Sequence, residues 1–332
     1  MNTEFAIQTI DTHTAGEPTR IVTDGLDRSL LTADGRSVKE RRDAFAEHAD
    51  DVREFLMQEP RGHADMFGAV LLDPEDPTAD VGAFFMDAGG YLDMCGHGTI
   101  GLVSALIRLG RLPERDVIRV ETPAGLVEAT PQYDGGDVVA VTVQNVSSFV
   151  YDAVDVTVSG IGDVHVDVVY AGNFFALVDA DELGIPVTRE TLPALVEHGL
   201  EIRDAVNDTL DIVHPFTGEA GRVSIAELYA SGADADRSAV VFGNGQVDRS
   251  PCGTGTCAKM TLLYAHDELE LDEPYTHESP LGTRFEGRLV DAETREERVV
   301  TTPTITGSAR ITGDHTFLKE PADQLTGFDL PT

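Results

Sequence analysis

Two segments of the sequence share a five-residue pattern, Cys-Gly-x-Gly-Thr, that could perform acid–base chemistry. Cys95 begins the first copy and Cys252 the second, and an apolar run with helical periodicity follows each. A cysteine at the start of a helix lies where free backbone N–H groups and the positive end of the helix dipole converge, so we expect its thiol pKa to fall below about 8.5. The glycines allow backbone N–H groups to approach an anion closely, which is typical of a carboxylate or phosphate site.

The two copies together predict a site with two proton-transferring groups. If they face each other across a domain interface, both can hold one bound carboxylate, with one sulfur on each side of its α-carbon. One thiolate then removes the α-proton while the other thiol protonates the opposite face. Backbone donors and helix dipoles stabilise the charge that collects on the carboxylate as the proton leaves. The pattern predicts a racemase that needs neither a cofactor nor a metal.

The spacing of the copies indicates how the chain is organised. They lie 157 residues apart (252 minus 95), close to half of the 332 residues, which favours one copy in each of two domains. We expect an N-terminal domain over 1–147 and a C-terminal domain over 148–332, whose terminal segment can return to the first domain. Helical periodicity covers 39–57, 98–109, 189–199 and 255–266, and β-branched extended segments cover 117–121, 138–143, 164–169 and 299–302. This mixture predicts an α+β fold.

The composition excludes several classes of protein. Apolar residues make up 41% of the chain and none of their runs reaches membrane-spanning length, so we expect a soluble protein. The 59 acidic residues outnumber the 24 basic ones, and a net charge of -35 argues against nucleic-acid binding. The acidic residues are spread along the chain, which indicates adaptation to high salt. Three cysteines and an N-terminus that reads as a strand, not a signal peptide, predict a cytoplasmic location.

Several motifs resemble those of the proline racemase family, and the likeness covers nearly the whole chain. The two signature motifs correspond to Met94–Gly101 and Asp248–Thr256, and other landmarks correspond to Asp11–Arg20, Glu59–His63, Glu121–Gly125 and Gly172–Phe175. The resemblance implies a diaminopimelate-epimerase-like fold, in which two pseudo-symmetric domains each wrap a curved sheet around a central helix. It also implies a small imino-acid substrate, and it is compatible with a homodimer.

The resemblance assigns roles to individual residues. Cys95 and Cys252 would be the two bases. The carboxylate of the substrate would be held by the residues that follow them, namely Gly96, His97, Gly253 and Thr254. Asp248 and the His97 side chain would receive the ring nitrogen.

The residues at positions 252 and 224 help to predict which imino acid is the substrate. Members similar to trans-3-hydroxyproline dehydratases have threonine where this chain has Cys252, whereas racemases and 4-hydroxyproline 2-epimerases have cysteine. The sequence Gly-His-Gly-Thr in the first motif resembles the 4-hydroxyproline epimerases more than the eukaryotic proline racemases. Many of those enzymes have a histidine where this chain has Ser224, although serine can still bond a ring hydroxyl. We therefore expect 4-hydroxyproline, with proline as the alternative.

The same residues allow other interpretations. Gly96–Gly101 matches the G-x-G-x-x-G fingerprint of dinucleotide sites, but that interpretation leaves both cysteines and the second copy unexplained. The spacing of the cysteines is not that of structural zinc sites. Cys257 lies too far into its helix to benefit from the dipole and is expected in the core. An amino-acid-binding protein without catalysis is a further alternative, which the two intact thiols disfavour.

Overall fold

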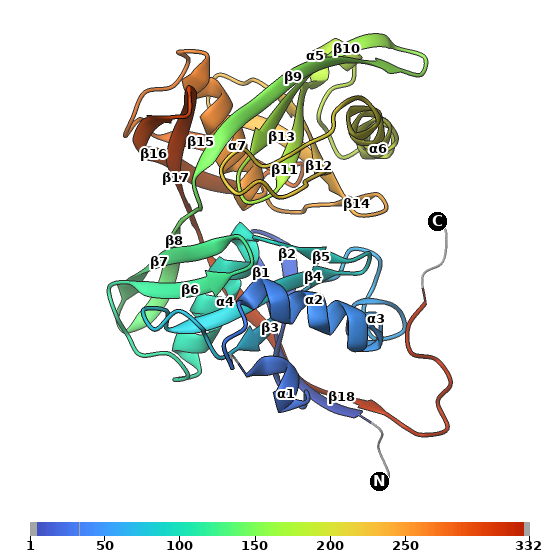
Figure 1. Ribbon diagram of the computed structural model, residues 1–332, viewed down its shortest axis with the longest axis vertical. Coiled ribbons are helices and arrows are strands. Elements are labelled where there is room, and N and C mark those ends of the chain that lie inside the picture. Colours follow the sequence, from blue (N-terminus) through green and yellow to red (C-terminus); the bar gives the residue numbers. More distant parts are fainter. Residues whose placement is uncertain (1–4, 33, 329–332) are drawn as a thin grey trace. The chain divides into compact units, whose positions relative to one another are not determined.

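The computed structural model describes residues 5–32 and 34–328 and divides the chain into two compact units (Figure 1). Unit 1 comprises Met1–Val143 and Gly307–Thr332, and unit 2 comprises Gln144–Thr306. The predicted boundary after residue 147 lies four residues beyond the observed one. The terminal segment returns to unit 1, as the sequence-based expectation allowed, because β18 (Ala309–Lys319) pairs along its length with β1 (Phe5–Thr14).

The sheet of unit 1 is mixed. β18 and β2 (Glu17–Asp24) flank β1 as antiparallel neighbours, and β2 pairs in parallel with β3 (Phe67–Leu72). β3 pairs with β4 (Val81–Asp87). The other edge of β4 pairs with β6 (Ile118–Thr122) near its start and with β5 (Tyr91–Leu92) near its end. β6 pairs with β7 (Gly125–Asp134), and β8 (Asp137–Gln144) follows.

A helix without any polar face lies inside this sheet. α4 (Gly96–Arg108) is buried from Gly96 to Ile107 and packs against β1, β2, β3, β7 and β18. A helix that is apolar all round must be covered on all sides, which is why the sheet curves around it. α4 and β1 lie so close together that a Cβ at Gly101 would be 2.7 Å from the hydroxyl oxygen of Thr12 on β1.

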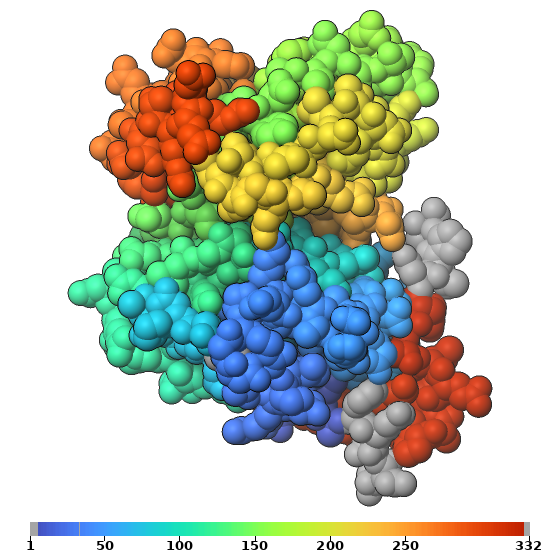
Figure 2. All heavy atoms as spheres, viewed as in Figure 1, coloured from blue at the N-terminus to red at the C-terminus, as the bar shows by residue number. Residues whose placement is uncertain are grey.

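Three helices cover part of the other face of the unit 1 sheet. They are α1 (Arg28–Leu31), α2 (Val38–His48) and α3 (Asp50–Met57), so the single helix predicted over 39–57 is interrupted at Ala49. Ser37 and Glu40 form a capping box that fixes the start of α2. The segment after β18 returns to this layer (Figure 2), where Arg61 Nη2 lies 2.6 Å from Asp323 Oδ2.

The strands of unit 2 form a closed ring. Its neighbours in order are β9 (Ser148–Val158), β10 (Gly162–Tyr170), β11 (Phe174–Asp179), β12 (Val223–Ala230), β13 (Asp236–Phe242), β15 (Tyr275–Glu278), β16 (Arg284–Arg295) and β17 (Arg298–Gly307), which pairs again with β9. The short β14 (Gln246–Val247) pairs antiparallel with the last two residues of β13. α7 (Gly253–Ala265) packs against β9, β10, β11 and β16 from inside.

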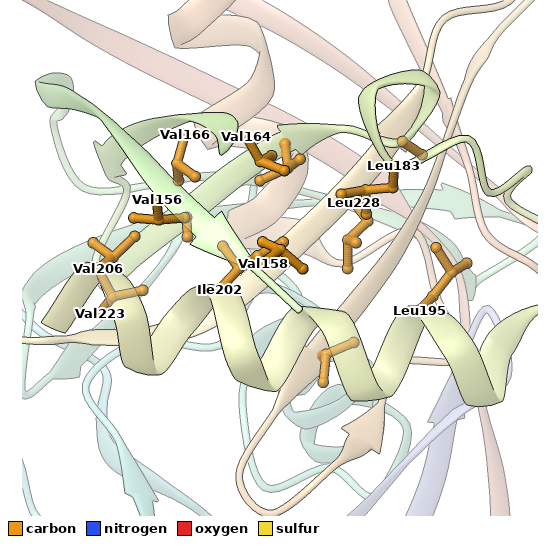
Figure 3. Close-up of a cluster of buried hydrophobic side chains, with 14 of the residues drawn as sticks. Val156, Val158, Val164, Val166, Leu183, Leu195, Ile202, Val206, Val223 and Leu228 are labelled. Atoms are coloured by element: carbon orange, nitrogen blue, oxygen red, sulfur yellow. The ribbon is translucent and has the colours of Figure 1, made fainter. Parts of the chain in front are cut away.

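The outer face of the unit 2 sheet is covered by α6 (Leu192–Thr209), with the short α5 (Ala180–Leu183) beside β10 to β12. Leu195, Ile202 and Val206 project from α6 into a cluster of valines and leucines on the strands, as Figure 3 shows. α6 continues ten residues beyond the predicted end at 199, because this apolar stripe continues with helical spacing.

The structure confirms the α+β class. The predicted helices over 98–109 and 255–266 correspond to α4 and α7, and the four predicted extended segments lie in β6, β8, β10 and β17. Among the described residues, no helix combines the length and the apolar character needed to cross a membrane.

Candidate functional site

The first half of the candidate site is built on the amino terminus of α4. Cys95 is the N-cap residue, and its Sγ accepts a hydrogen bond from the backbone N–H of Gly98 at 3.2 Å. The Thr99 hydroxyl donates to the carbonyl of Cys95 at 2.7 Å. A Cβ at Gly98 would lie 3.0 Å from this sulfur and 2.8 Å from the ring of Phe85 on β4. The second glycine of the pattern is therefore required to seat the thiol.

His97 lies beside the same sulfur. Its Nδ1 is 3.3 Å from Cys95 Sγ, its ring packs edge-on against Phe67 at 4.6 Å, and its backbone carbonyl accepts a hydrogen bond from Thr14. Cys95 and His97 are both about 5% exposed, so little water competes for these contacts. A ring nitrogen that carries a proton here can donate it in a hydrogen bond to a thiolate.

The second half repeats the cap on α7, with a different backbone. Cys252 is the N-cap residue, its Sγ accepts from the Gly255 N–H at 3.4 Å, and the Thr256 hydroxyl donates to its carbonyl at 2.7 Å. Unlike Cys95, whose φ is -144°, Cys252 has φ of 62°, in the left-handed region that non-glycine residues rarely adopt. Such strain persists only where neighbouring contacts enforce it.

The loop before Cys252 supplies some of those contacts. The carboxylate of Asp248 accepts hydrogen bonds from the backbone N–H and the hydroxyl of Ser250, at 2.8 and 2.7 Å. The Ser250 oxygen in turn accepts the Cys252 N–H at 3.1 Å. Asp248, predicted as a substrate contact, is therefore also a support of the cysteine backbone.

The electrostatics of Cys252 differ from the prediction. Burial raises the pKa of its thiol well above the ordinary value, and the charges of Asp248 and Glu227 add to this effect. The Gly255 N–H opposes the shift but does not outweigh it. The expectation that a helix start lowers the pKa is thus wrong for Cys252, because burial of the thiolate outweighs the hydrogen bonds from Gly255 and Thr254.

The remaining predicted residues have clear positions. Gly96 and His97 open α4, and Gly253 and Thr254 open α7, so their N–H groups belong to the turn that has no partners within the helix. Thr254 Oγ1 lies 3.8 Å from Cys252 Sγ. Ser224 is half-buried near the start of β12. Cys257 is fully buried inside α7, as expected of a core residue.

Sequence reasoning missed a group of buried polar residues behind Cys252. Glu227 on β12 and His277 on β15 are both 0% exposed, and Oε1 of the former lies 3.5 Å from Nε2 of the latter. Burial raises the pKa of Glu227 to about 8, and burial lowers the pKa of His277 to about 3. The sequence feature that could have revealed this group is Glu227, a charged residue inside the apolar segment 223–230.

Each half of the site brings its predicted residues together: Cys95, Gly96 and His97 in unit 1, and Asp248, Cys252, Gly253 and Thr254 in unit 2. Among the described residues, no three His, Cys, Asp or Glu side chains are grouped as metal ligands. The three cysteines are free thiols.

Comparison with known proteins extends these observations. Residues 9–328 match the model of a family described as proline racemase. The chain is 40% identical to the proline racemase of Clostridioides difficile over 333 residues, covering 98% of each chain. It is also 40% identical to the 4-hydroxyproline 2-epimerase of Streptosporangium roseum over 330 residues, covering 97% of this chain and 98% of that one.

A solved structure shows the same architecture. The hydroxyproline epimerase of Agrobacterium vitis, with bound trans-4-hydroxy-L-proline, superposes with a TM-score of 0.91 at 28% identity, covering 99% of this chain and 97% of that one. Together with the two helices that each lie inside a sheet, this likeness confirms the predicted diaminopimelate-epimerase-like fold.

Proposed function

This chain belongs to the proline racemase family, and from that premise we propose that it is a racemase or epimerase that inverts the α-carbon of proline-like imino acids. One observation carries the proposal beyond family membership. Two buried cysteines each cap a helix and accept a backbone N–H at the sulfur. Thiols in this setting can exchange protons with a substrate out of contact with bulk water.

The proposed reaction uses one sulfur on each face of the substrate. In one direction, the Cys95 thiolate takes the α-proton and the Cys252 thiol gives its proton to the opposite face. The raised pKa of Cys252 suits the second step, since the residue then enters the reaction as a thiol. Hydrogen bonds from Gly98 N–H and from the His97 ring support a negative sulfur at Cys95. The reverse reaction exchanges the roles.

The proposed substrate contacts follow from the two helix starts. The first-turn N–H groups of Gly96, His97, Gly253 and Thr254 would hold the carboxylate, which gains charge as the α-proton leaves. Asp248 and the His97 side chain would receive the ring nitrogen. A carboxylate beside a secondary ammonium keeps it protonated, and this lowers the cost of forming the carbanion.

We propose 4-hydroxyproline as the preferred substrate. Two observations support it: the Gly-His-Gly-Thr sequence after Cys95, and a half-buried hydroxyl at Ser224 that can bond a ring hydroxyl. The named relatives include both a proline racemase and a 4-hydroxyproline epimerase at the same identity, so proline is the second candidate.

Alanine variants of the three cysteines test the mechanism. We expect Cys95→Ala and Cys252→Ala each to lower kcat/KM for isomerisation by at least about 10²- to 10⁴-fold, because each removes one proton-transfer group. Cys257→Ala is the matched control, since its thiol lies in the core of the same helix, and its activity should stay close to that of the wild type. Loss of activity in Cys257→Ala equal to the other two would contradict the assignment.

A panel of stereoisomers tests the substrate. The expected order of kcat/KM places trans-4-hydroxy-L-proline above L-proline, with solvent deuterium entering the α-position of both. Trans-3-hydroxy-L-proline should not be dehydrated productively, because a thiol at Cys252 can reprotonate the second face. Faster turnover of proline would overturn the substrate assignment and leave the two-thiol mechanism intact. Unchanged selectivity in Ser224→Ala would remove Ser224 from the proposal.

We also propose a cytoplasmic location, which the three free thiols support, because thiols persist in a reducing compartment.

A further inference from the structure

A buried carboxyl group lies directly beneath the start of α7. A Cβ built on Gly255 would be 2.4 Å from Glu227 Oε2 and 3.3 Å from Cys252 Sγ. The carboxylate oxygen and the sulfur are therefore no more than 5.7 Å apart, the sum of those two distances. Both side chains are buried, so little water screens one from the other. Glu227 can thus influence Cys252 although no step of the proposed reaction uses it.

The first copy of the pattern has a different group at the corresponding position. Gly98 occupies the place of Gly255, and the side chain beneath it is the ring of Phe85, which is fully buried. The two caps therefore share their hydrogen bonds and differ in what lies behind them. At this position, the cap of Cys252 has a carboxyl group and the cap of Cys95 has an aromatic ring.

The hydrogen bonds around His277 define where a proton is held. The single hydroxyl proton of Thr256 is donated to the carbonyl of Cys252 at 2.7 Å. Nδ1 of His277 lies 3.0 Å from the same hydroxyl oxygen, so it must be the donor of that pair. A neutral imidazole with a proton on Nδ1 presents a lone pair at Nε2, and Nε2 faces Glu227 Oε1 at 3.5 Å. A lone pair repels a carboxylate but accepts a hydrogen bond from a protonated carboxyl group.

We propose that Glu227 and His277 together hold one proton beneath the amino terminus of α7, and that this proton allows Cys252 to ionise during the reaction. With the proton present, the carboxyl group is neutral and does not repel a thiolate. With the proton lost, a fixed negative charge lies within 5.7 Å of the sulfur and cancels the attraction of the helix dipole. Glu227 is in this sense a positioning residue, and the inference rests on the proposed role of Cys252.

The charges around Glu227 are consistent with a protonated carboxyl group. Burial is the main reason that its pKa rises to about 8, and the positive charge of Lys259 and a hydrogen bond from Ser238 act in the other direction. The Lys259 ammonium lies over the ring of Tyr229, 3.3 Å from its centre, and does not form an ion pair with the carboxyl group. The groups that face this pocket come from α7, β12, β13, β15 and the loop after β14, and they are Lys259, Tyr229, Asp236, Ser238, Tyr275, His277 and Asp248.

The test measures the ionisation of Cys252 directly. Native enzyme is alkylated with iodoacetamide between pH 6 and 10.5, and the modification of each cysteine is followed by peptide mass spectrometry. In Glu227→Gln, whose amide can still donate to His277, we expect the midpoint for Cys252 to fall by about two pH units. This is the effect of removing one charge within 5.7 Å at an effective dielectric constant of about 20. Glu278→Gln, on the same strand as His277, is the matched control and should leave the midpoint unchanged.

A second variant moves the profile in the opposite direction. His277→Leu removes the acceptor for the carboxyl proton, so Glu227 should ionise at lower pH and alkylation of Cys252 at pH 7.5 should become several-fold slower. Profiles of either variant that overlay the wild type, or shifts of both in one direction, overturn the inference. Failure of the proposed function is a separate result: it appears as full isomerisation activity in Cys252→Ala, whatever the alkylation profiles show.

Discussion

The Glu227–His277 pair predicts how the stability of the protein changes with pH. The pKa of Glu227 is raised by burial from 4.5 to about 8, so between these values the folded protein holds a proton that the unfolded chain has lost. Stability therefore falls as pH rises through this range. The pKa of His277 is lowered by burial from 6.5 to about 3, so here the unfolded chain holds the extra proton and stability rises with pH. The two effects cancel between pH 4.5 and 6.5.

Above pH 6.5, only Glu227 of this pair still changes the free energy of unfolding with pH. One proton difference changes the free energy of unfolding by about 1.4 kcal/mol per pH unit, so the interval from 6.5 to about 8 corresponds to a loss of about 2 kcal/mol. Glu227→Gln lacks this proton. The wild type should accordingly lose about 2 kcal/mol relative to the variant between pH 6.5 and 8.

Urea denaturation in buffers of constant molar salt measures this difference. Glu278→Gln is the control, because hydrogen bonds from Arg237 and Arg284 lower the pKa of Glu278, so it is ionised in both states throughout the interval. Its stability curve should run parallel to that of the wild type. If the Glu227→Gln curve is also parallel to the wild type between pH 6.5 and 8, the buried proton does not exist.

Three further predictions address other parts of the molecule. Gly255→Ala should lose roughly 1–3 kcal/mol of stability and most activity, because its Cβ would lie 2.4 Å from Glu227 Oε2. Gly199→Ala, whose Cβ would meet side-chain atoms of Leu228 and Val241 at 3.1 Å or more, should lose clearly less stability in a thermal melt. Activity and stability should increase from dilute buffer to molar salt, because the net charge of -35 is screened; maximal stability in dilute buffer would refute this. Exhaustive chelation should leave turnover unchanged, and the purified protein should lack pyridoxal absorbance, since the proposed chemistry needs only thiols; activity restored by one added metal would contradict it.

The fold was predictable where one segment determines its own environment. The runs after Cys95 and Cys252 are apolar nearly all round, except for Lys259 in the second, which predicts helices enclosed by other elements, and α4 and α7 are such helices. The partner of the C-terminal strand was harder to predict. Nothing local in 309–319 indicates pairing with β1 rather than with unit 2, because strand partners are chosen by long-range packing. Ala49, which separates α2 from α3, has no helix-breaking sequence signal either.

The site was predictable to the same extent. The pattern Cys-Gly-x-Gly-Thr determines the cap, the sulfur hydrogen bond and the threonine contact with the cysteine carbonyl, and both copies have all three. The acidity of Cys252 was not predictable, since it depends on burial and on Glu227, which comes from β12. A dipole effect can be inferred from a helix start, whereas a desolvation effect requires knowledge of what covers the thiol.

The difference between the two copies has a chemical rationale. The proposed two-base reaction needs one sulfur protonated and one ionised at the start of each turnover, and identical environments would leave that choice undetermined. Here Cys95 has a histidine beside it and an aromatic ring beneath its cap, whereas Cys252 has an acidic loop beside it and a carboxyl group beneath. The charge of Asp248 disfavours a thiolate at Cys252, whereas a hydrogen bond donated by the His97 ring favours a thiolate at Cys95. The resting enzyme is therefore expected to carry its proton on Cys252, and the buried proton of Glu227 and His277 keeps that preference small enough for the roles to reverse.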